Sequence, residues 1–68
     1  MKVIIIGLGT QGYKRKNILL KRKKYVCSFD PINRDAEVDK IEKLDRYNYD
    51  TVFICCPDKF KKKYILYF

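Results

Sequence analysis

The sequence predicts an α/β fold in which a three-stranded parallel sheet is flanked by helices. Three short runs rich in β-branched, aromatic and other apolar residues, at positions 2–6, 25–29 and 51–56, are each followed by a segment with helical features. Alternation of strands and helices is typical of parallel sheets joined by right-handed crossovers. A chain of 68 residues is at most one domain, and it contains no internal repeat and no linker.

The first strand and helix are predicted from the segment that begins the chain. Residues 2–6 (KVIII) form an apolar run, as expected for a strand that is buried on both faces. The run ends at Gly7. From Gly12 to about Lys24 the chain has no proline, no further glycine and many residues of high helix propensity. This segment predicts a helix with a narrow apolar stripe.

The middle of the chain predicts a second strand, a second helix and a third strand. Residues 25–29 (YVCSF) are β-prone and end at Asp30-Pro31, where proline removes the donor that a continuing ladder needs. In residues 35–46, apolar side chains recur at near-helical spacing beneath a charged surface, which predicts a short helix. Residues 51–56 (TVFICC) then run apolar into Pro57, as a third buried strand.

The last segment predicts a helix with one apolar face. Asp58 is a plausible N-cap. Aromatic side chains follow at spacings i, i+4, i+7 and i+8: Phe60, Tyr64, Tyr67 and Phe68. We expect this face to pack on the sheet and, where it lacks a partner, to mediate self-association.

Composition limits the classes of partner and site. With 47% apolar residues the chain is too hydrophobic for a disordered tail. Three cysteines without metal-ligand spacing, and no histidine, predict neither a disulfide framework nor a metal site. The first apolar run is too short for a signal sequence or a membrane span, so we expect a cytoplasmic protein without a membrane partner.

The glycines of GLGTQG carry the clearest chemical signal. Gly7, Gly9 and Gly12 stand at the first, third and sixth positions, after a strand and at the start of a helix. In a dinucleotide site they make the tight turn, let the backbone approach the pyrophosphate, and let helix and strand pack closely. Amides around Thr10, Gln11 and Gly12 would meet the phosphates at the positive end of the helix dipole. The motif predicts a Rossmann-like partial domain.

Asp30 adds a second part to this pattern. It stands at the end of the second predicted strand, where a carboxylate accepts hydrogen bonds from ribose hydroxyls and repels a 2′-phosphate. We therefore expect NAD as the cofactor, with NADP less favoured. The alternative is an ordinary strand-to-helix turn in which Asp30 only caps the strand.

The segments KVIIIGLGTQG, FDP and YDTVFICCPD, followed by a hydrophobic helix, resemble the beginning of a Gfo/Idh/MocA-family oxidoreductase. The resemblance covers the whole chain and implies the NAD(P)-binding Rossmann domain of a sugar or amino-sugar dehydrogenase. In that family a pair such as Thr-Pro follows the third motif's strand. Cys56-Pro57 occupies that position here, so the resemblance implies that Cys56 and Pro57 border the cofactor.

The part of that family that carries catalysis has no counterpart in the sequence. There is no Glu-Lys-Pro motif and no histidine, so no catalytic residue is assigned. Residues 1–68 are expected to be the N-terminal part of a dinucleotide-binding domain, without independent dehydrogenase activity. The resemblance therefore predicts cofactor binding and leaves the substrate undefined.

A small basic nucleic-acid-binding module is the alternative function. The formal net charge is +8, and basic residues cluster with nearby aromatic residues at positions 14–16, 21–24 and 61–63. The simpler interpretation is that these lysines and arginines cover solvated helix faces, and it is favoured because lysine dominates and no RNA-binding motif is present. Arg15 or Lys14, in the first turn of the first helix, could instead reach a cofactor phosphate.

Overall fold

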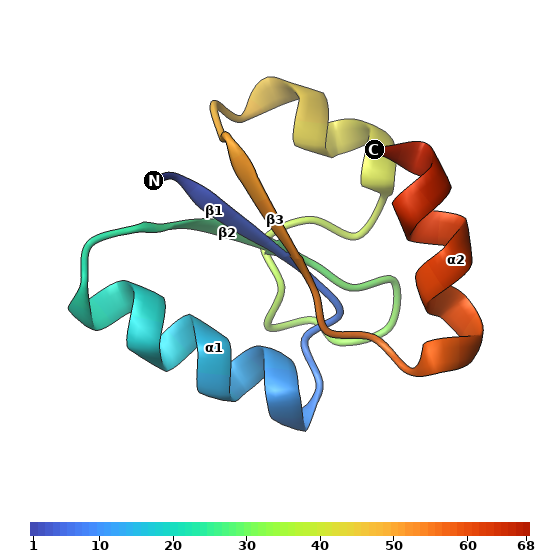
Figure 1. Ribbon diagram of the computed structural model, residues 1–68, viewed down its shortest axis with the longest axis horizontal. Coiled ribbons are helices and arrows are strands. Elements are labelled where there is room, and N and C mark those ends of the chain that lie inside the picture. Colours follow the sequence, from blue (N-terminus) through green and yellow to red (C-terminus); the bar gives the residue numbers. More distant parts are fainter.

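The computed structural model describes residues 1–68 and shows an α/β fold with a three-stranded parallel sheet between helices, as the sequence predicts (Figure 1). The sheet order is β2-β1-β3, and both pairs of neighbours are parallel. The elements in chain order are β1 (Val3–Ile6), α1 (Thr10–Lys21), β2 (Tyr25–Phe29), the 3₁₀ helix η1 (Ile41–Arg46), β3 (Thr51–Ile54) and α2 (Asp58–Tyr67).

Strand β1 is the centre of the molecule. All of its side chains are completely buried, as expected for a central strand with apolar residues toward both faces. On one face, Val3 and Ile5 pack with Leu19 of α1. On the other face, Ile4 and Ile6 belong to a larger cluster that includes side chains from β2, η1 and α2. Figure 1 accordingly shows α1 on one side of the sheet and α2 with η1 on the other.

The helix predicted over residues 35–46 is wrong in its first half. Only Ile41–Arg46 are helical, as a 3₁₀ helix, whereas Val38 forms a parallel bridge with Phe29. Val38 is 2% exposed, and the extended pairing gives both of its backbone polar groups a partner on β2 or just after it. The apolar residues Ile41 and Leu44 are three positions apart, which matches a 3₁₀ helix with its three residues per turn.

Several predicted boundaries also differ from the structure. Helix α1 begins at Thr10, before Gly12, and ends at Lys21, because Lys23 takes a left-handed conformation with φ of 57°. Strand β3 ends at Ile54, two residues earlier than predicted, and its side chains are only partly buried, whereas the sequence predicted a buried strand. Asp58 is the first residue of α2 and makes no cap hydrogen bond; its carboxylate pairs with Lys61 at 3.0 Å.

The aromatic face predicted for the last helix is divided between core and solvent. Tyr64 is 9% exposed and packs edge-on against Phe29, with ring centroids 5.7 Å apart. Phe60, Tyr67 and Phe68 remain 44 to 45% exposed. None of the helices combines the length and apolarity that a bilayer crossing requires.

Candidate functional site

Gly7 makes the turn between β1 and α1, and the backbone there requires glycine. Its φ is +93°, a conformation that residues with a Cβ rarely adopt. A Cβ at this position would also lie 2.9 to 3.0 Å from the backbone and Cβ of Cys56, which follows β3. The turn therefore packs directly against the carboxyl end of β3, and Gly7 has the structural role that the sequence predicts.

Gly12 allows α1 to lie close to the turn. A Cβ added at Gly12 would stand 2.2 Å from the carbonyl oxygen of Gly7, far inside any real contact. The helix could carry a side chain there only by moving away from β1. This close approach is the packing role predicted from the third glycine of the motif.

Gly9 differs from the other two glycines because neither its backbone conformation nor the packing around it requires glycine. Its backbone is extended, with φ of −95°, and a Cβ at this position would meet nothing within 4 Å. Gly9 is exposed and lines a groove of the molecule. A glycine that leaves open space at the start of a helix is expected where a ligand approaches the backbone closely.

The first turn of α1 has backbone amides that take no part in the helical hydrogen bonds. The first bond into the helix is donated by the Tyr13 amide to the Gly9 carbonyl, at 2.9 Å, so the amides of Thr10, Gln11 and Gly12 precede the helical hydrogen bonds. The first turn contains no acidic residue, and the last contains Lys21. Partial positive charge from the helix dipole is therefore not neutralised by a side chain of the first turn.

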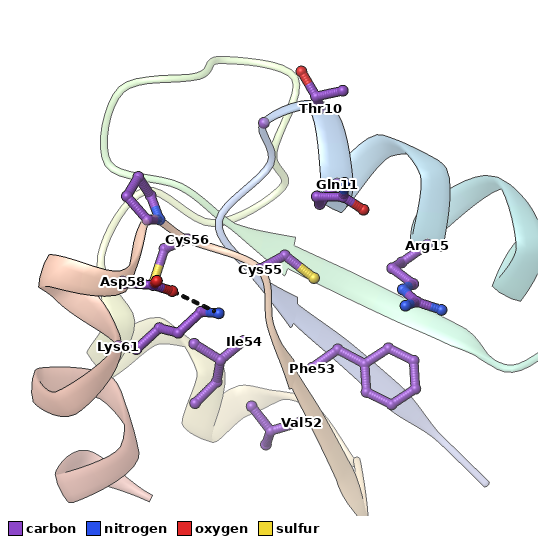
Figure 2. Close-up of a pocket in the computed structure, with 12 residues that line it drawn as sticks. Thr10, Gln11, Arg15, Val52, Phe53, Ile54, Cys55, Cys56, Asp58 and Lys61 are labelled. Carbon is purple, nitrogen blue, oxygen red and sulfur yellow. Dashed lines mark ion pairs between the residues drawn. The ribbon is translucent and has the colours of Figure 1, made fainter.

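The groove has a volume of about 840 Å³ and lies between α1 and α2, beside β3 (Figure 2). It brings together Gly9, Thr10, Gln11, Cys56 and Pro57 of the predicted site. Two cations also line it, and they come from different helices: Arg15 from α1 and Lys61 from α2.

The position of the groove follows from the topology. Strand β1 lies between β2 and β3, and the crossover through α1 and that through η1 lie on opposite faces of the sheet. The carboxyl ends of β1 and β3 thus flank a topological switch point, where open α/β sheets bind their ligands.

Two cysteines from the end of β3 border the groove from opposite faces of the sheet. Cys55 packs with the cluster beneath α1, and Cys56 packs with the cluster beneath α2. Burial raises the pKa of both thiols above the ordinary value. Both are therefore protonated at neutral pH and contribute small apolar surface to the groove wall.

Asp30 lies outside this groove and holds the backbone around the glycine turn. Its Oδ2 accepts a hydrogen bond from the Leu8 amide at 2.9 Å, and its Oδ1 accepts bonds from the amides of Ile32 and Asn33, both at 2.9 Å. It lines a second, polar hollow of about 540 Å³ with residues that follow β2. An ionised carboxylate has about four acceptor positions, so a position on Oδ2 remains for a ligand.

Asn33 is a site residue that sequence reasoning missed. Its Nδ2 donates to the Leu8 carbonyl at 2.7 Å and to the Tyr13 hydroxyl at 3.2 Å. Together, Asp30 and Asn33 bind both backbone polar groups of Leu8, a residue inside the glycine turn. The sequence separation of 25 between Asn33 and Leu8 left no local pattern from which this contact could be found.

Stability is expected to fall in acid, in part through Asp30. Partial burial opposes ionisation of Asp30, but hydrogen bonds from the Asn33, Ile32 and Leu8 amides outweigh it and lower the pKa. The ionised Asp30 carboxylate therefore stabilises the folded state fully above its unfolded-state pKa near 3.9. This stabilisation is lost as pH falls through the lower folded-state pKa.

We expect the melting temperature of the chain to drop as pH falls below about 4, and to drop less in an Asp30→Asn variant. Circular dichroism melts at pH values above and below about 4 measure this drop in melting temperature, and a variant at an exposed position, Asp45→Asn, is the control. Equal pH profiles for Asp30→Asn and the unmodified chain would contradict the assignment.

The basic runs that suggested nucleic-acid binding lie on separate helices. Positions 14–16 belong to α1 and positions 61–63 to α2, which cover opposite sides of the sheet (Figure 1). Lys16 lies 3.9 Å from Glu37 and above the Tyr25 ring, and Lys61 pairs with Asp58. Of these runs only Arg15 and Lys61 line the groove, so the glycine turn is the stronger candidate site.

The chain matches no protein-family model, and no curated protein and no solved structure shows significant similarity to it.

Proposed function

We propose that the glycine turn and the first turn of α1 bind the pyrophosphate of a dinucleotide, with NAD preferred over NADP. The observation that carries this proposal is Gly9, because its missing side chain leaves the groove open where the helix begins, at a position where the fold itself does not require glycine. A phosphate that approaches the backbone closely would require glycine at this position.

Donors and charges near Gly9 support an anionic ligand. The amides of Thr10, Gln11 and Gly12 would hold the phosphates, because they precede the helical hydrogen bonds and lie at the positive end of the α1 dipole. Arg15 lines the same groove on the α1 side. Cys56 and Pro57 would border the cofactor from the end of β3.

Asp30 supports the preference for NAD. Its remaining acceptor position on Oδ2 suits a ribose hydroxyl, whereas its negative charge opposes a 2′-phosphate. The bonds to Leu8, Ile32 and Asn33 also fix this carboxylate beside the turn, so a ribose would meet an acceptor that is already oriented. Asp30 would thus act both on the ligand and on the turn.

We further propose that this binding belongs to an oxidoreductase of the Gfo/Idh/MocA kind, acting on a sugar or amino sugar. The support is the resemblance of the glycine motif, the FDP segment and the YDTVFICCPD segment. Bound NAD would supply the hydride acceptor. The residues described here would bind and orient it, and none of them is assigned a catalytic role.

Thermal unfolding with added cofactor tests the proposal. Ligand at a hundredfold its dissociation constant stabilises the folded state by about 2.7 kcal/mol, which for a domain of this size raises the melting temperature by roughly 10 to 20 °C. We expect that shift with NADH, a smaller one with NADPH, and none with adenosine, which lacks the phosphates. A cooperative melt that NADH does not shift would overturn the proposal.

A further inference from the structure

The loop after β2, residues 30–37, contains no helix or strand, so other contacts must hold it against the fold. At its far end it is anchored by the bridge between Val38 and Phe29. Within the loop, the Ala36 amide donates to the Asn33 carbonyl at 3.2 Å, which closes only a local turn. The place of the middle of the loop therefore depends on bonds made by side chains.

Asn33 is the residue of this loop that joins the parts of the proposed site. Its Nδ2 donates to the Leu8 carbonyl in the glycine turn at 2.7 Å and to the Tyr13 hydroxyl on α1 at 3.2 Å. Its backbone amide donates to Oδ1 of Asp30 at 2.9 Å. One half-buried residue thus connects the glycine turn, the beginning of α1 and the Asp30 carboxylate.

A closed ring of hydrogen bonds fixes the orientation of the Asn33 carboxamide. The Asp35 amide donates to Oδ1 of Asn33 at 2.9 Å, and the Tyr13 hydroxyl donates to the Asp35 carboxylate. The Tyr13 hydroxyl in turn accepts the bond from Nδ2 of Asn33, so each group in the ring meets a partner of the required kind. Rotation of the carboxamide by half a turn would set its oxygen against the Leu8 carbonyl oxygen, so one orientation is selected.

These bonds link the two places where a dinucleotide would be held. Tyr13 is also the residue whose amide donates to the Gly9 carbonyl, so its side chain belongs to the turn of α1 that offers amides to a phosphate. The Asp30 carboxylate is the acceptor offered to a ribose. A ligand that carries both groups must meet both places at one spacing, and a site that is already rigid at that spacing loses less freedom when the ligand binds.

We propose that Asn33, supported by the Tyr13 hydroxyl, is a positioning residue that fixes the spacing between the phosphate-binding amides of α1 and the Asp30 carboxylate. This inference rests on the proposed function and names the residue on which the preference for NAD depends. Asn33 acts through Asp30 and the glycine turn, not through contact with the cofactor. Without its side chain, Asp30 can move with its loop away from a 2′-phosphate, so binding of NADH weakens more than binding of NADPH.

A ligand that spans both places, compared with one that occupies a single place, tests this role. Asn33→Ala is expected to raise the dissociation constant of NADH about tenfold, and Tyr13→Phe, which removes only a hydroxyl, about threefold, since one hydrogen bond corresponds to about fivefold in affinity. The ratio of NADH affinity to NADPH affinity should fall in both variants. Affinity for inorganic pyrophosphate, which needs only the amides of α1, should stay unchanged. Isothermal titration measures each affinity at a temperature where circular dichroism shows the variant folded.

Matched controls are Asn48→Ala and Tyr47→Phe, which make the same changes at exposed positions outside the site. Both should bind NADH as the unmodified chain does. If Asn33→Ala does not fold, the comparison of Tyr13→Phe with Tyr47→Phe decides.

The outcomes separate this proposal from the proposed function. If the unmodified chain binds NADH and the variants at positions 33 and 13 bind it equally well, the positioning role is overturned and the proposed function stands. Equal losses of affinity for NADH, NADPH and pyrophosphate would also overturn the positioning role, because a general loosening of the glycine turn acts on all three ligands. A folded, unmodified chain that binds neither NADH nor pyrophosphate would overturn both.

Discussion

Replacing Gly12 with alanine is expected to lower the melting temperature by about 10 °C or more, or to abolish cooperative unfolding. Helix propensity acts in the opposite direction, since alanine is favoured over glycine by about 1 kcal/mol in a helix. The added Cβ, however, would lie 2.2 Å from the Gly7 carbonyl oxygen. Overpacking costs typically about 1 to 3 kcal/mol, and more where the obstacle is backbone.

The Gly7 carbonyl cannot yield easily. Gly7 has a positive φ, its amide donates to the Phe29 carbonyl at 2.8 Å, and Cys56 packs against it. A net loss of about 2 kcal/mol is large for a domain of this size, whose core supplies about 3 to 5 kcal/mol.

Asn17→Ala provides a matched control for this substitution. Asn17 is an exposed residue of the same helix, so alanine there should leave stability unchanged or raise it slightly. Circular dichroism melts of the two variants compare the effects directly. If Gly12→Ala melted at the temperature of the unmodified chain, the close packing of α1 on the glycine turn would be refuted.

Replacing Gly9 with aspartate is expected to preserve the fold and to weaken NADH binding by roughly a hundredfold. Gly9 is the N-cap of α1, where aspartate is among the preferred residues, and its side chain would enter open space. Stability should therefore stay equal or rise by a few tenths of a kcal/mol. The same carboxylate would stand where the phosphates bind, and repulsion between charges about 4 Å apart near a protein surface reaches roughly 4 kcal/mol before screening.

Gly9→Asn separates charge from shape in this experiment. Asparagine caps a helix as well as aspartate does and has nearly the same size, but it carries no charge. We expect it also to weaken NADH binding, because its side chain fills the open space at the start of α1, but less than aspartate, which adds charge repulsion. Isothermal titration measures both affinities. Equal affinity of Gly9→Asp and the unmodified chain for NADH would show that phosphates do not bind at this helix.

Several features of the molecule could be predicted because they depend on neighbouring residues. The apolar run of β1, the glycines behind it and the helix-forming segment after them each follow from short-range pattern and backbone sterics. The roles of Gly7 and Gly12 are those that the motif predicts. The three parallel strands follow from the alternation of element types.

Features that depend on distant contacts could not be predicted. Residues 35–38 have a composition compatible with a helix, yet Val38 pairs with Phe29 because the edge of β2 offers its backbone groups partners. The bonds from Asp30 and Asn33 to Leu8 join residues 22 and 25 positions apart. No local pattern marks such contacts, since each forms only once the sheet has brought its two segments together.

The sequence by itself determined the α/β fold, the order of its strands and helices along the chain, and the glycine turn at the end of the first strand. Only the tertiary structure decided which glycine the fold does not require and which groups bind Asp30. The physical reason is that backbone conformation is set largely by neighbouring residues, whereas open space and hydrogen-bond partners are set by segments that meet after folding.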